Sequence, residues 1–482
     1  MQKEIAQLEP KEVWKYFLEI TQVPRPSKKE EKIIKYLIDF AKKHNLEYKT
    51  DKTGNVLILK PANNGSNRTV VLQSHMDMVC EKNSDLSFDF DNDPIQTVIE
   101  NDWVTAKGTT LGADDGIGMA AELALLVSTD IEHPNLECLF TVDEETGLTG
   151  AFGLEPNFLK GDILLNLDSE DDGEIFIGCA GGIDTLIELP YISENTPQNQ
   201  KAFKINVFGL QGGHSGDDIQ KGRGNANKIL SRILWNADKN LSLRINTFDA
   251  GNLRNAIARE GFAIITIPAE KETELINYIS EMDAILKNEF HITDNNVSIS
   301  IEETTLPDTV IDKKSQNNLL NSLYSCPHGV IAWSQDIDNF VETSTNLAAV
   351  KTKKDYFYIT TSQRSSVESA RENIKDMVTA AFDLTGAKIT SGDGYPGWAP
   401  NPNSEIVKMT AESYETLFSE KPKVLAIHAG LECGLIGETY PKMDMISFGP
   451  TIKGAHSPAE AIKIDTVTKF WELTKDVLKK IK

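Results

Sequence analysis

A short apolar run that ends in three consecutive acids is the feature that most limits what this chain can be. Residues 136–142 read as a buried strand, and Asp143, Glu144 and Glu145 follow it directly, ahead of a turn at Gly147. Adjacent carboxylates at the end of a buried strand repel one another and need compensation. A divalent metal is the commonest compensation, because it takes one carboxylate as a ligand and leaves its neighbour free as a base. A solvated acidic turn would explain the three acids alone, so the metal hypothesis depends on the rest of the chain.

Other predicted strand and loop ends carry metal-ligand chemistry too. They are His75 and Asp77 after the run 69–74, Asp168 after the run 162–167, the glycine-flanked pair Asp114-Asp115 at a helix start, and the loop residue His456. Each has an ordinary alternative: a satisfied histidine, a helix N-cap or a solvated loop. Together they supply the nitrogen and oxygen ligands that suit paired zinc, cobalt or manganese ions.

The ligand inventory also suggests a reaction. If Asp114 bridges two ions, each ion receives one histidine and one carboxylate of its own. Asp77 can accept the proton of the second His75 ring nitrogen, which fixes the tautomer. Glu144 then remains free beside Glu145 to take a proton from the attacking water. This pattern indicates two-metal hydrolysis of an acyl bond.

Composition excludes several other classes of protein. The chain has 482 residues and a net charge of −23, which argues against nucleic acid or an anionic membrane surface as a partner. Its five cysteines form no C-x-x-C pair, which favours a reducing compartment. The N-terminus has no apolar leader, and the most apolar helical stretch, 118–127, is short and contains Glu122. We therefore expect a cytoplasmic protein without a membrane span.

The order of predicted elements gives an interrupted first domain. Residues 1–185 read as an α/β sheet, 186–390 as an inserted α+β domain after a polar connector, and 391–482 as a return to the first domain, because His456 lies there. Ser27 and Glu30 form a capping-box pattern for a helix over 27–44, and no internal repeat is evident. Further helices are expected at 10–22, 217–237, 270–289, 315–325, 366–384, 403–418 and 465–481, and further strands at 203–209, 242–248, 296–301, 356–362, 423–427 and 443–448.

Several motifs resemble those of a known enzyme group. They are His75-Met76-Asp77, Gly112-Ala113-Asp114-Asp115-Gly116, Asp143-Glu144-Glu145-Thr146-Gly147, Asn166-Leu167-Asp168 and Gly454-Ala455-His456-Ser457. In this order they resemble the co-catalytic zinc exopeptidases that include carnosinase, peptidase T and carboxypeptidase G. A second set is similar to the bacterial dipeptidases of that group: Gly212-Gly213-His214-Ser215-Gly216, Gly251-Asn252-Leu253-Arg254-Asn255-Ala256, Tyr395-Pro396-Gly397-Trp398 and His428-Ala429-Gly430-Leu431-Glu432-Cys433-Gly434.

The resemblance implies a fold and a role for each site residue. The fold would be a di-zinc exopeptidase domain, a mixed sheet flanked by helices, with an inserted α+β lid that also serves dimerisation. Metal ligands would be His75 and Asp168 for one ion, Glu145 and His456 for the other, and Asp114 for both. Asp77 and Glu144 would be catalytic, and His214, Asn255 and Arg364 would bind substrate. A cis peptide bond between Asp114 and Asp115 is implied as well.

The expected activity is therefore a metallopeptidase that cleaves unblocked dipeptides, Xaa-His and broader, with two divalent ions, zinc first and cobalt or manganese as alternatives. A homodimer is expected, and His214 would act in its own chain or in a partner. An aminoacylase or tripeptidase on the same metal centre remains an alternative. A non-catalytic metal-dependent binding protein is another, although the presence of Glu144 favours an enzyme.

Overall fold

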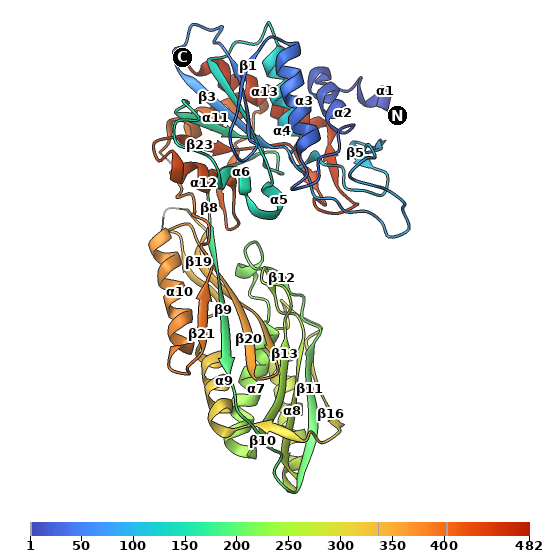
Figure 1. The fold of residues 1–482 in the computed structure, drawn as a ribbon, viewed down its shortest axis with the longest axis vertical. Helices are drawn as coiled ribbons and strands as arrows, with labels where there is room; N and C mark the ends of the chain where they lie inside the picture. The colour runs from blue at the N-terminus through green and yellow to red at the C-terminus, as the bar shows by residue number, and fades with distance from the viewer. Residues whose placement is uncertain (1, 336, 402) are drawn as a thin grey trace. The chain divides into compact units, whose positions relative to one another are not determined.

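The computed structural model describes residues 2–335, 337–401 and 403–482, which form two compact units (Figure 1). Unit 1 comprises residues 1–179, 398–426 and 431–482, and unit 2 comprises residues 180–397 and 427–430. These limits lie a few residues from 185/186 and 390/391, because Gly182 pairs with Tyr395 and so ties both connecting segments to unit 2. In the described residues, no helix has the length and apolarity that crossing a bilayer requires.

Unit 1 is built on a mixed eight-stranded sheet in the order β1-β2-β6-β3-β7-β23-β8-β22. Strands β6, β3, β7 and β23 are parallel neighbours, whereas β2 and β8 pair antiparallel at their two sides. The bounds are β1 Glu47–Thr50, β2 Val56–Lys60, β3 Thr69–His75, β6 Asn135–Thr141, β7 Ile163–Asn166, β8 Glu174–Cys179, β22 Lys423–Ile427 and β23 Asp444–Ser447. The parallel strands are almost wholly buried, as expected of a sheet covered on both faces.

Helices cover this sheet, with α4 against β3 and α11 against β23. Their bounds are α1 Gln2–Ile5, α2 Lys11–Ile20, α3 Glu31–Lys43, α4 Ala113–Val127, α5 Glu144–Gly147, α6 Thr149–Phe152, α11 Glu405–Phe418, α12 Glu432–Thr439 and α13 Ile464–Lys480. A small sheet, β24-β25-β5-β4, joins β4 Thr97–Glu100 and β5 Trp103–Ala106 to the hairpin of β24 Ile452–Lys453 and β25 Ala461–Lys463. The turn of that hairpin carries His456, so the small sheet sets it beside the segment leading into α4.

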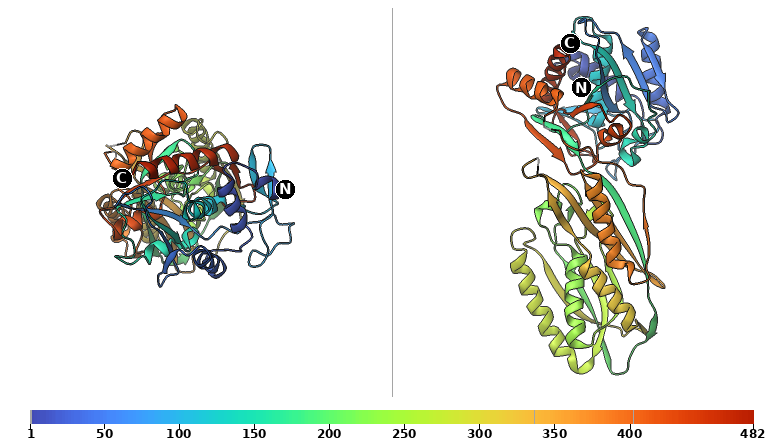
Figure 2. Two further views of the ribbon diagram at one scale, coloured as in Figure 1. Left: turned by 90° about the horizontal axis from the view of Figure 1, so that it is seen from above. Right: turned by 90° about the vertical axis from the view of Figure 1, so that its left-hand side faces the viewer.

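Unit 2 contains a nine-stranded sheet with its helices on one face (Figure 2). The sheet order is β16-β11-β15-β13-β19-β20-β9-β21, with β18 beside β19. Strand bounds are β9 Gly181–Pro190, β11 Gln200–Phe208, β13 Arg244–Ala250, β15 Gly261–Pro268, β16 Ser298–Thr304, β18 Gly329–Trp333, β19 Val341–Thr352, β20 Tyr356–Ser365 and β21 Lys388–Ser391. The helices are α7 Ala226–Leu241, α8 Glu272–Glu289, α9 Lys313–Ser325 and α10 Glu368–Asp383, with short turns η1 Ile219–Lys221 and η2 Ala269–Lys271. Small pairs complete the unit: β10 Ser193–Asn195 with β17 Thr309–Ile311, and β12 Gly213–His214 with β14 Ala256–Ile257.

The topology of unit 2 repeats, although the sequence shows no repeat. The first half runs β11-α7-β13-β15-α8-β16, and the second runs β9-α9-β19-β20-α10-β21. Numbered within its half, each set of four strands has the order fourth, first, third, second, all antiparallel. The halves meet where β13 pairs with β19, and the first half is inserted between β9 and α9 of the second. The repeat is therefore evident in the fold, although none is evident in the sequence.

The structure also corrects one predicted helix. A helix was expected over 217–237, but α7 begins at Ala226, and residues 219–221 form only a 3-10 turn. The reason is local: Gly222 has a φ of +66°, and the Asn225 side chain accepts the N–H groups of Asn227 and Lys228 as an N-cap.

Candidate metal and catalytic site

The carboxyl ends of three neighbouring parallel strands of unit 1 gather the predicted ligands at one sheet edge. His75 is the last residue of β3, Glu144 and Glu145 follow β6, and Asp168 lies two residues beyond β7. Asp114 enters from the start of α4, and His456 from the β24–β25 turn. In open α/β sheets, bound molecules and ions usually sit just outside the carboxyl ends of the parallel strands, which is where these side chains gather.

Two histidine–carboxylate groups share Asp114. His75 Nε2 lies 2.9 Å from Asp114 Oδ1 and 3.4 Å from Asp168 Oδ1. His456 Nε2 lies 3.2 Å from Asp114 Oδ2 and 2.9 Å from Glu145 Oε2. Each Asp114 oxygen thus serves one group, which is the arrangement that a carboxylate bridging two cations needs. The cis peptide bond expected between Asp114 and Asp115 is confirmed.

The charges of this cluster fit divalent cations. Hydrogen bonds to Asp114 and Glu145 raise the pKa of His456 to about 11. Burial works against a charged His75, but Asp168, Asp114 and Asp77 still raise its pKa well above the usual range. Burial also opposes ionisation of Asp114, yet the hydrogen bonds of both histidines hold its pKa below normal. Glu145 Oε1 is buried without a hydrogen-bond partner in the described chain. The raised pKa values of His75 and His456 show how strongly these carboxylates favour a positive charge beside them, and two cations would supply it, so the residues present fit a two-metal site.

Asp77 connects the ligand His75 to the segment that carries Glu144. Its Oδ1 lies 3.4 Å from His75 Nδ1 and accepts the backbone N–H of Glu144 at 3.0 Å. Its Oδ2 accepts the Ser27 hydroxyl at 2.7 Å and the backbone N–H of Glu145 at 3.3 Å. Asp77 therefore orients the imidazole and anchors the turn after β6 at the same time.

The predicted capping box at Ser27 and Glu30 is wrong. Helix α3 begins at Glu31 with no side-chain cap. Ser27 binds Asp77 instead, and Glu30 Oε1 accepts the backbone N–H groups of Lys28 and Asp143 at 2.8 and 3.1 Å. Instead of capping a helix, these two side chains bind Asp77 and the backbone of Asp143, because those tertiary partners lie within hydrogen-bonding distance.

Glu144 is half-buried next to the ligands. Burial raises the pKa of Glu144 well above that of an ordinary glutamate, and the carboxylates of Asp168, Glu432 and Glu145 raise it further while His75 lowers it. It makes no short contact with either histidine, unlike its neighbour Glu145. A carboxylate that is near the ligands but not among them can exchange protons with a bound molecule.

One charged residue beneath the site had not been singled out from the sequence. Glu432, the fully buried first residue of α12, accepts hydrogen bonds from Gln73 Nε2 at 2.6 Å and Thr141 Oγ1 at 2.7 Å. Gln73 in turn accepts from Asn166 at 2.7 Å, so a polar row crosses β6, β3 and β7 one layer below the ligands. Burial raises the pKa of Glu432 to about 7. The available signal was a polar residue two positions before two of the predicted ligands, Gln73 before His75 and Asn166 before Asp168.

The predicted substrate-binding residues lie in unit 2. His214 in β12 pairs with Ala256 in β14, and Asn255 O accepts the Ser215 N–H at 2.8 Å, so the His214 and Asn255 segments are neighbours. His214 Nδ1 lies 3.2 Å from Asp217 Oδ2, and this hydrogen bond, with help from the Arg364 charge, lowers the pKa of Asp217.

Arg364 lies on β20 with an aromatic and an imidazole neighbour. Its Nη1 donates to Tyr395 Oη at 3.0 Å, and its register partner Ser344 holds His428 Nε2 at 2.7 Å. Burial and the Arg364 charge lower the pKa of His428 to about 3, so this ring is neutral at physiological pH. The structure thus gathers Arg364, Tyr395 and His428, of which only Arg364 was predicted as a binding residue.

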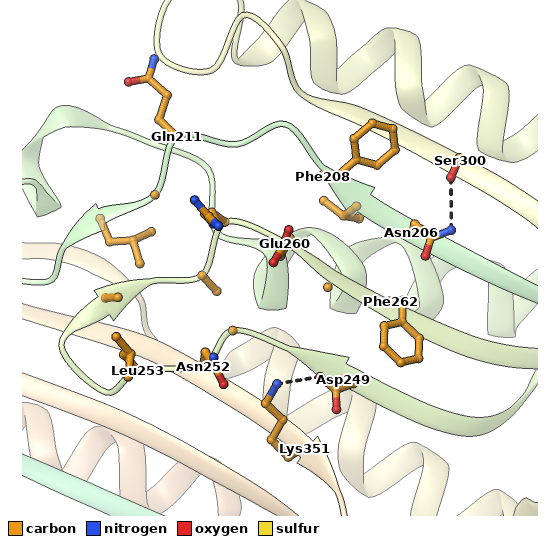
Figure 3. A pocket seen from close by; sticks show the side chains of 18 of the residues that line it. Asn206, Phe208, Gln211, Asp249, Asn252, Leu253, Glu260, Phe262, Ser300 and Lys351 are labelled. Carbon is orange, nitrogen blue, oxygen red and sulfur yellow. Dashed lines mark hydrogen bonds and ion pairs between the residues drawn. The ribbon is translucent and has the colours of Figure 1, made fainter. Parts of the chain in front are cut away.

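A pocket of about 890 Å³ in unit 2 borders the segments of His214 and Asn255, because Gly213 and Ala256 line it (Figure 3). Asn206, Phe262, Ser300 and Lys351 are among its lining residues, whereas His214, Asn255 and Arg364 are not. Two of its lysines are paired with acidic neighbours, Lys351 with Asp249 at 2.7 Å and Lys204 with Glu302 at 3.6 Å. These two lysines therefore give the pocket no net positive charge, because each is paired with a carboxylate.

Comparison with known proteins places this geometry in a family. Residues 71–480 match the group described as peptidase family M20/M25/M40. The chain belongs to this family. It is 42% identical over 480 residues to the cytosol non-specific dipeptidase of Escherichia coli strain K12, covering 99% of both chains. Among solved structures, the aminoacylhistidine dipeptidase of Vibrio alginolyticus matches with a TM-score of 0.93 and 43% identity, over 99% of this chain and 98% of that one.

A more distant match supports the fold alone. The aminopeptidase PepT of Bacillus cereus ATCC 10987 matches with a TM-score of 0.63 at 17% identity, over 98% of this chain and 99% of that one. The predicted resemblance to the exopeptidase group and to its bacterial dipeptidases is confirmed, as is the predicted fold class.

Proposed function

We propose that this chain is a dipeptidase that hydrolyses unblocked dipeptides, Xaa-His and broader, with two bound divalent metal ions. The observation that carries the proposal is the pair of histidine–carboxylate groups that share Asp114, with Glu144 beside them and outside both. Full-length similarity to two proteins named as dipeptidases supports the choice of substrate.

His75 and Asp168 would hold one ion, Glu145 and His456 the other, and Asp114 both. When bound, the two ions would polarise the scissile carbonyl and make the attacking water more acidic. Nitrogen and carboxylate ligands suit zinc first, with cobalt or manganese as alternatives. Asp77 holds the His75 ring in the orientation that presents Nε2 to the site.

The remaining steps belong to the protein's own side chains. Glu144 takes the proton of the attacking water and later delivers it to the amine that leaves. His214 donates a hydrogen bond to the oxyanion that develops at the carbonyl, and Asn255 holds the same end of the substrate. Arg364 clasps the carboxylate at the substrate's C-terminus. Unit 2, as the predicted inserted lid, would therefore supply the groups that select a free dipeptide.

Two further expectations belong to the same proposal. A cytosolic location is supported by the name of the Escherichia coli relative, the cytosol non-specific dipeptidase. The expected homodimer would use unit 2, the domain that the resemblance assigns to dimerisation.

The test replaces the base without disturbing the ligands. Glu144→Gln should retain both metals, measured by metal analysis of the purified protein, while turnover falls by about 10²–10⁴-fold. The matched variant Glu145→Gln should lose metal as well as activity, because it removes a ligand. Chelation of the wild type should abolish turnover, and added zinc, cobalt or manganese should restore it.

Liquid chromatography of a panel of free dipeptides, tripeptides and N-acyl amino acids identifies the substrate. Preference for N-acyl amino acids or tripeptides would favour an aminoacylase or a tripeptidase instead. A Glu144→Gln variant with turnover above about a tenth of wild type would contradict the role of the base, since general-base catalysis is worth at least ten times more.

A further inference from the structure

A single buried carboxylate holds the backbone on which Asp114 sits. Glu460 is 2% exposed and accepts hydrogen bonds from four consecutive backbone N–H groups. Its Oε2 accepts from Leu111 at 2.7 Å and Gly112 at 2.9 Å, and its Oε1 accepts from Ala113 at 2.7 Å and Asp114 at 3.3 Å. Bonds from several N–H groups to one carboxylate are charge-assisted and fix the geometry of the segment.

A buried guanidinium holds the carbonyl side of the same segment. Arg25 is 2% exposed, and its Nη2 donates to Gly112 O at 2.5 Å. Its Nη1 donates to Met76 O at 3.1 Å and to Asp77 O. One side chain therefore joins the segment of Asp114 to the end of β3, where His75 and Asp77 lie.

The glycines beside Asp114 leave room for this guanidinium. A Cβ atom on Gly112 or on Gly116 would lie 2.7 Å from Arg25 Nη2. Gly112 also has a φ of +70°, whereas Gly116 has no left-handed backbone, so space for Arg25 is the reason for glycine at Gly116.

Glu460 also connects these segments to His456. It follows His456 by four residues in the same turn, where its own N–H donates to Ser457 O at 3.0 Å. Its carbonyl accepts the Thr105 hydroxyl at 2.9 Å, which ties the turn to β5. Arg25 and Glu460 together thus link the segments of His75, Asp114 and His456, and neither side chain is a predicted ligand.

We infer that Arg25 and Glu460 are positioning residues that set the spacing of the two metal positions through the backbone of residues 111–116. The inference rests on the proposed metal site and adds to it two residues that touch neither metal nor substrate. The physical reason is that the two Asp114 oxygens can serve two ions only if the backbone of Asp114 is fixed relative to both histidines. Outer-sphere partners of this kind typically change metal affinity or activity by about 10–100-fold.

The test uses Glu460→Gln and Arg25→Lys. A glutamine amide nitrogen cannot accept a hydrogen bond, so N–H groups of the segment lose their acceptor while size is kept. A lysine keeps the charge of Arg25 but cannot donate to carbonyls of both segments as the guanidinium fork does. Zinc affinity is measured by competition with a chelating dye, and the Co²⁺-loaded protein gives an absorption spectrum that reports ligand geometry. We expect zinc affinity to fall by about 10–100-fold, the cobalt spectrum to change, and kcat to fall with KM unchanged.

The matched control is Glu137→Gln. Glu137 is also buried in unit 1 and accepts the backbone N–H groups of Lys160 and Gly161 at 2.8 and 3.0 Å, but it binds no ligand-bearing segment. This variant should lower the midpoint of chemical unfolding without changing zinc affinity, the cobalt spectrum or kcat. Gly116→Ala is a second variant, which leaves both charged residues in place and displaces the guanidinium by one methyl group; it should weaken zinc binding as Arg25→Lys does.

The outcomes separate this inference from the proposed function. If the wild type binds no divalent metal, the proposed function fails. If the wild type binds zinc and the Glu460, Arg25 and Gly116 variants bind it equally well, with an unchanged cobalt spectrum and only lower unfolding midpoints, the inference is overturned and the two residues are purely structural. If Glu460→Gln does not fold, the same comparison is decided by Arg25→Lys and Gly116→Ala.

Discussion

Arg364→Lys tests how the carboxyl end of the substrate is held. Arg364 is 8% exposed, its Nη1 donates to Tyr395 Oη at 3.0 Å, and its buried Nε has no hydrogen-bond partner in the described residues, which leaves the Nε edge of the guanidinium for a ligand. A guanidinium can donate two parallel N–H groups to a carboxylate, whereas a lysine ammonium keeps the charge but not the fork. One hydrogen bond to a charged group is worth about 1.5–3 kcal/mol. Its loss should lower kcat/KM for a free dipeptide by about 10–150-fold.

The assay compares each free dipeptide with its C-terminal amide. An amide has no carboxylate for Arg364 to clasp, so the substitution should cost far less with the amide than with the acid. Arg371→Lys is the matched control, because Arg371 is 5% exposed and donates to the backbone carbonyl of Tyr395 without an assigned substrate contact. It should affect acid and amide alike. Equal losses on acid and amide for Arg364→Lys would refute carboxylate recognition by this residue.

Two further predictions concern stability and subunit exchange. Glu122 is fully buried, and burial raises its pKa well above the ordinary value of 4.5. Between pH 4.5 and the pKa of the folded protein, Glu122 is ionised in the unfolded chain and protonated in the folded one, so folding takes up a proton. Glu122→Gln should therefore gain stability over wild type by up to about 1.4 kcal/mol per pH unit in that window, measured by urea unfolding of metal-free protein from pH 5.5 to 8; a gain independent of pH would contradict it. Mixing His214→Ala with Glu144→Gln under subunit exchange tests whether His214 acts in its own chain or in a partner: recovered turnover would show that it serves a partner's site, and no recovery, with exchange shown independently, would show that it acts in its own chain.

The ligand positions could be predicted because each occupies a recognisable place in the sequence. A buried parallel strand reads as a continuous apolar run, so a polar residue at its end is conspicuous, as with His75 and Asp168. The structure brings these residues together because parallel neighbours end at one edge of the sheet. The prediction failed at Ser27 and Glu30, where a pattern typical of a helix cap has tertiary partners instead. Local sequence cannot tell a cap from a hydrogen bond to a strand end far along the chain.

The supporting residues could not be predicted for a related reason. Glu460 binds a segment that lies about 350 positions earlier in the chain, and Arg25 binds carbonyl groups, which every residue has. Because these hydrogen bonds go to backbone N–H and C=O groups, which every residue type except proline carries in full, the sequence of the bound segment does not reveal them. The glycines around Asp114 were the only trace, and their ordinary interpretation is conformational freedom rather than room for a side chain.

The repeated topology of unit 2 places the proposed substrate-binding residues in two structurally similar halves. The first half contributes His214 and Asn255, and the second contributes Arg364. The halves are joined by the antiparallel pair β13–β19, where Asp249 is the register partner of Lys351 and forms an ion pair with it at 2.7 Å. The loop of His214 lies against His428, since a Cβ atom on Gly216 would be 2.3 Å from His428 O, and Ser344 of the second half is hydrogen-bonded to His428 Nε2 at 2.7 Å. If His214 and Arg364 have the roles proposed for them, the spacing between the oxyanion donor and the carboxylate-binding residue is set by sheet pairing within unit 2, and substitutions at that pairing should alter the preference for dipeptides over longer peptides before they alter metal binding.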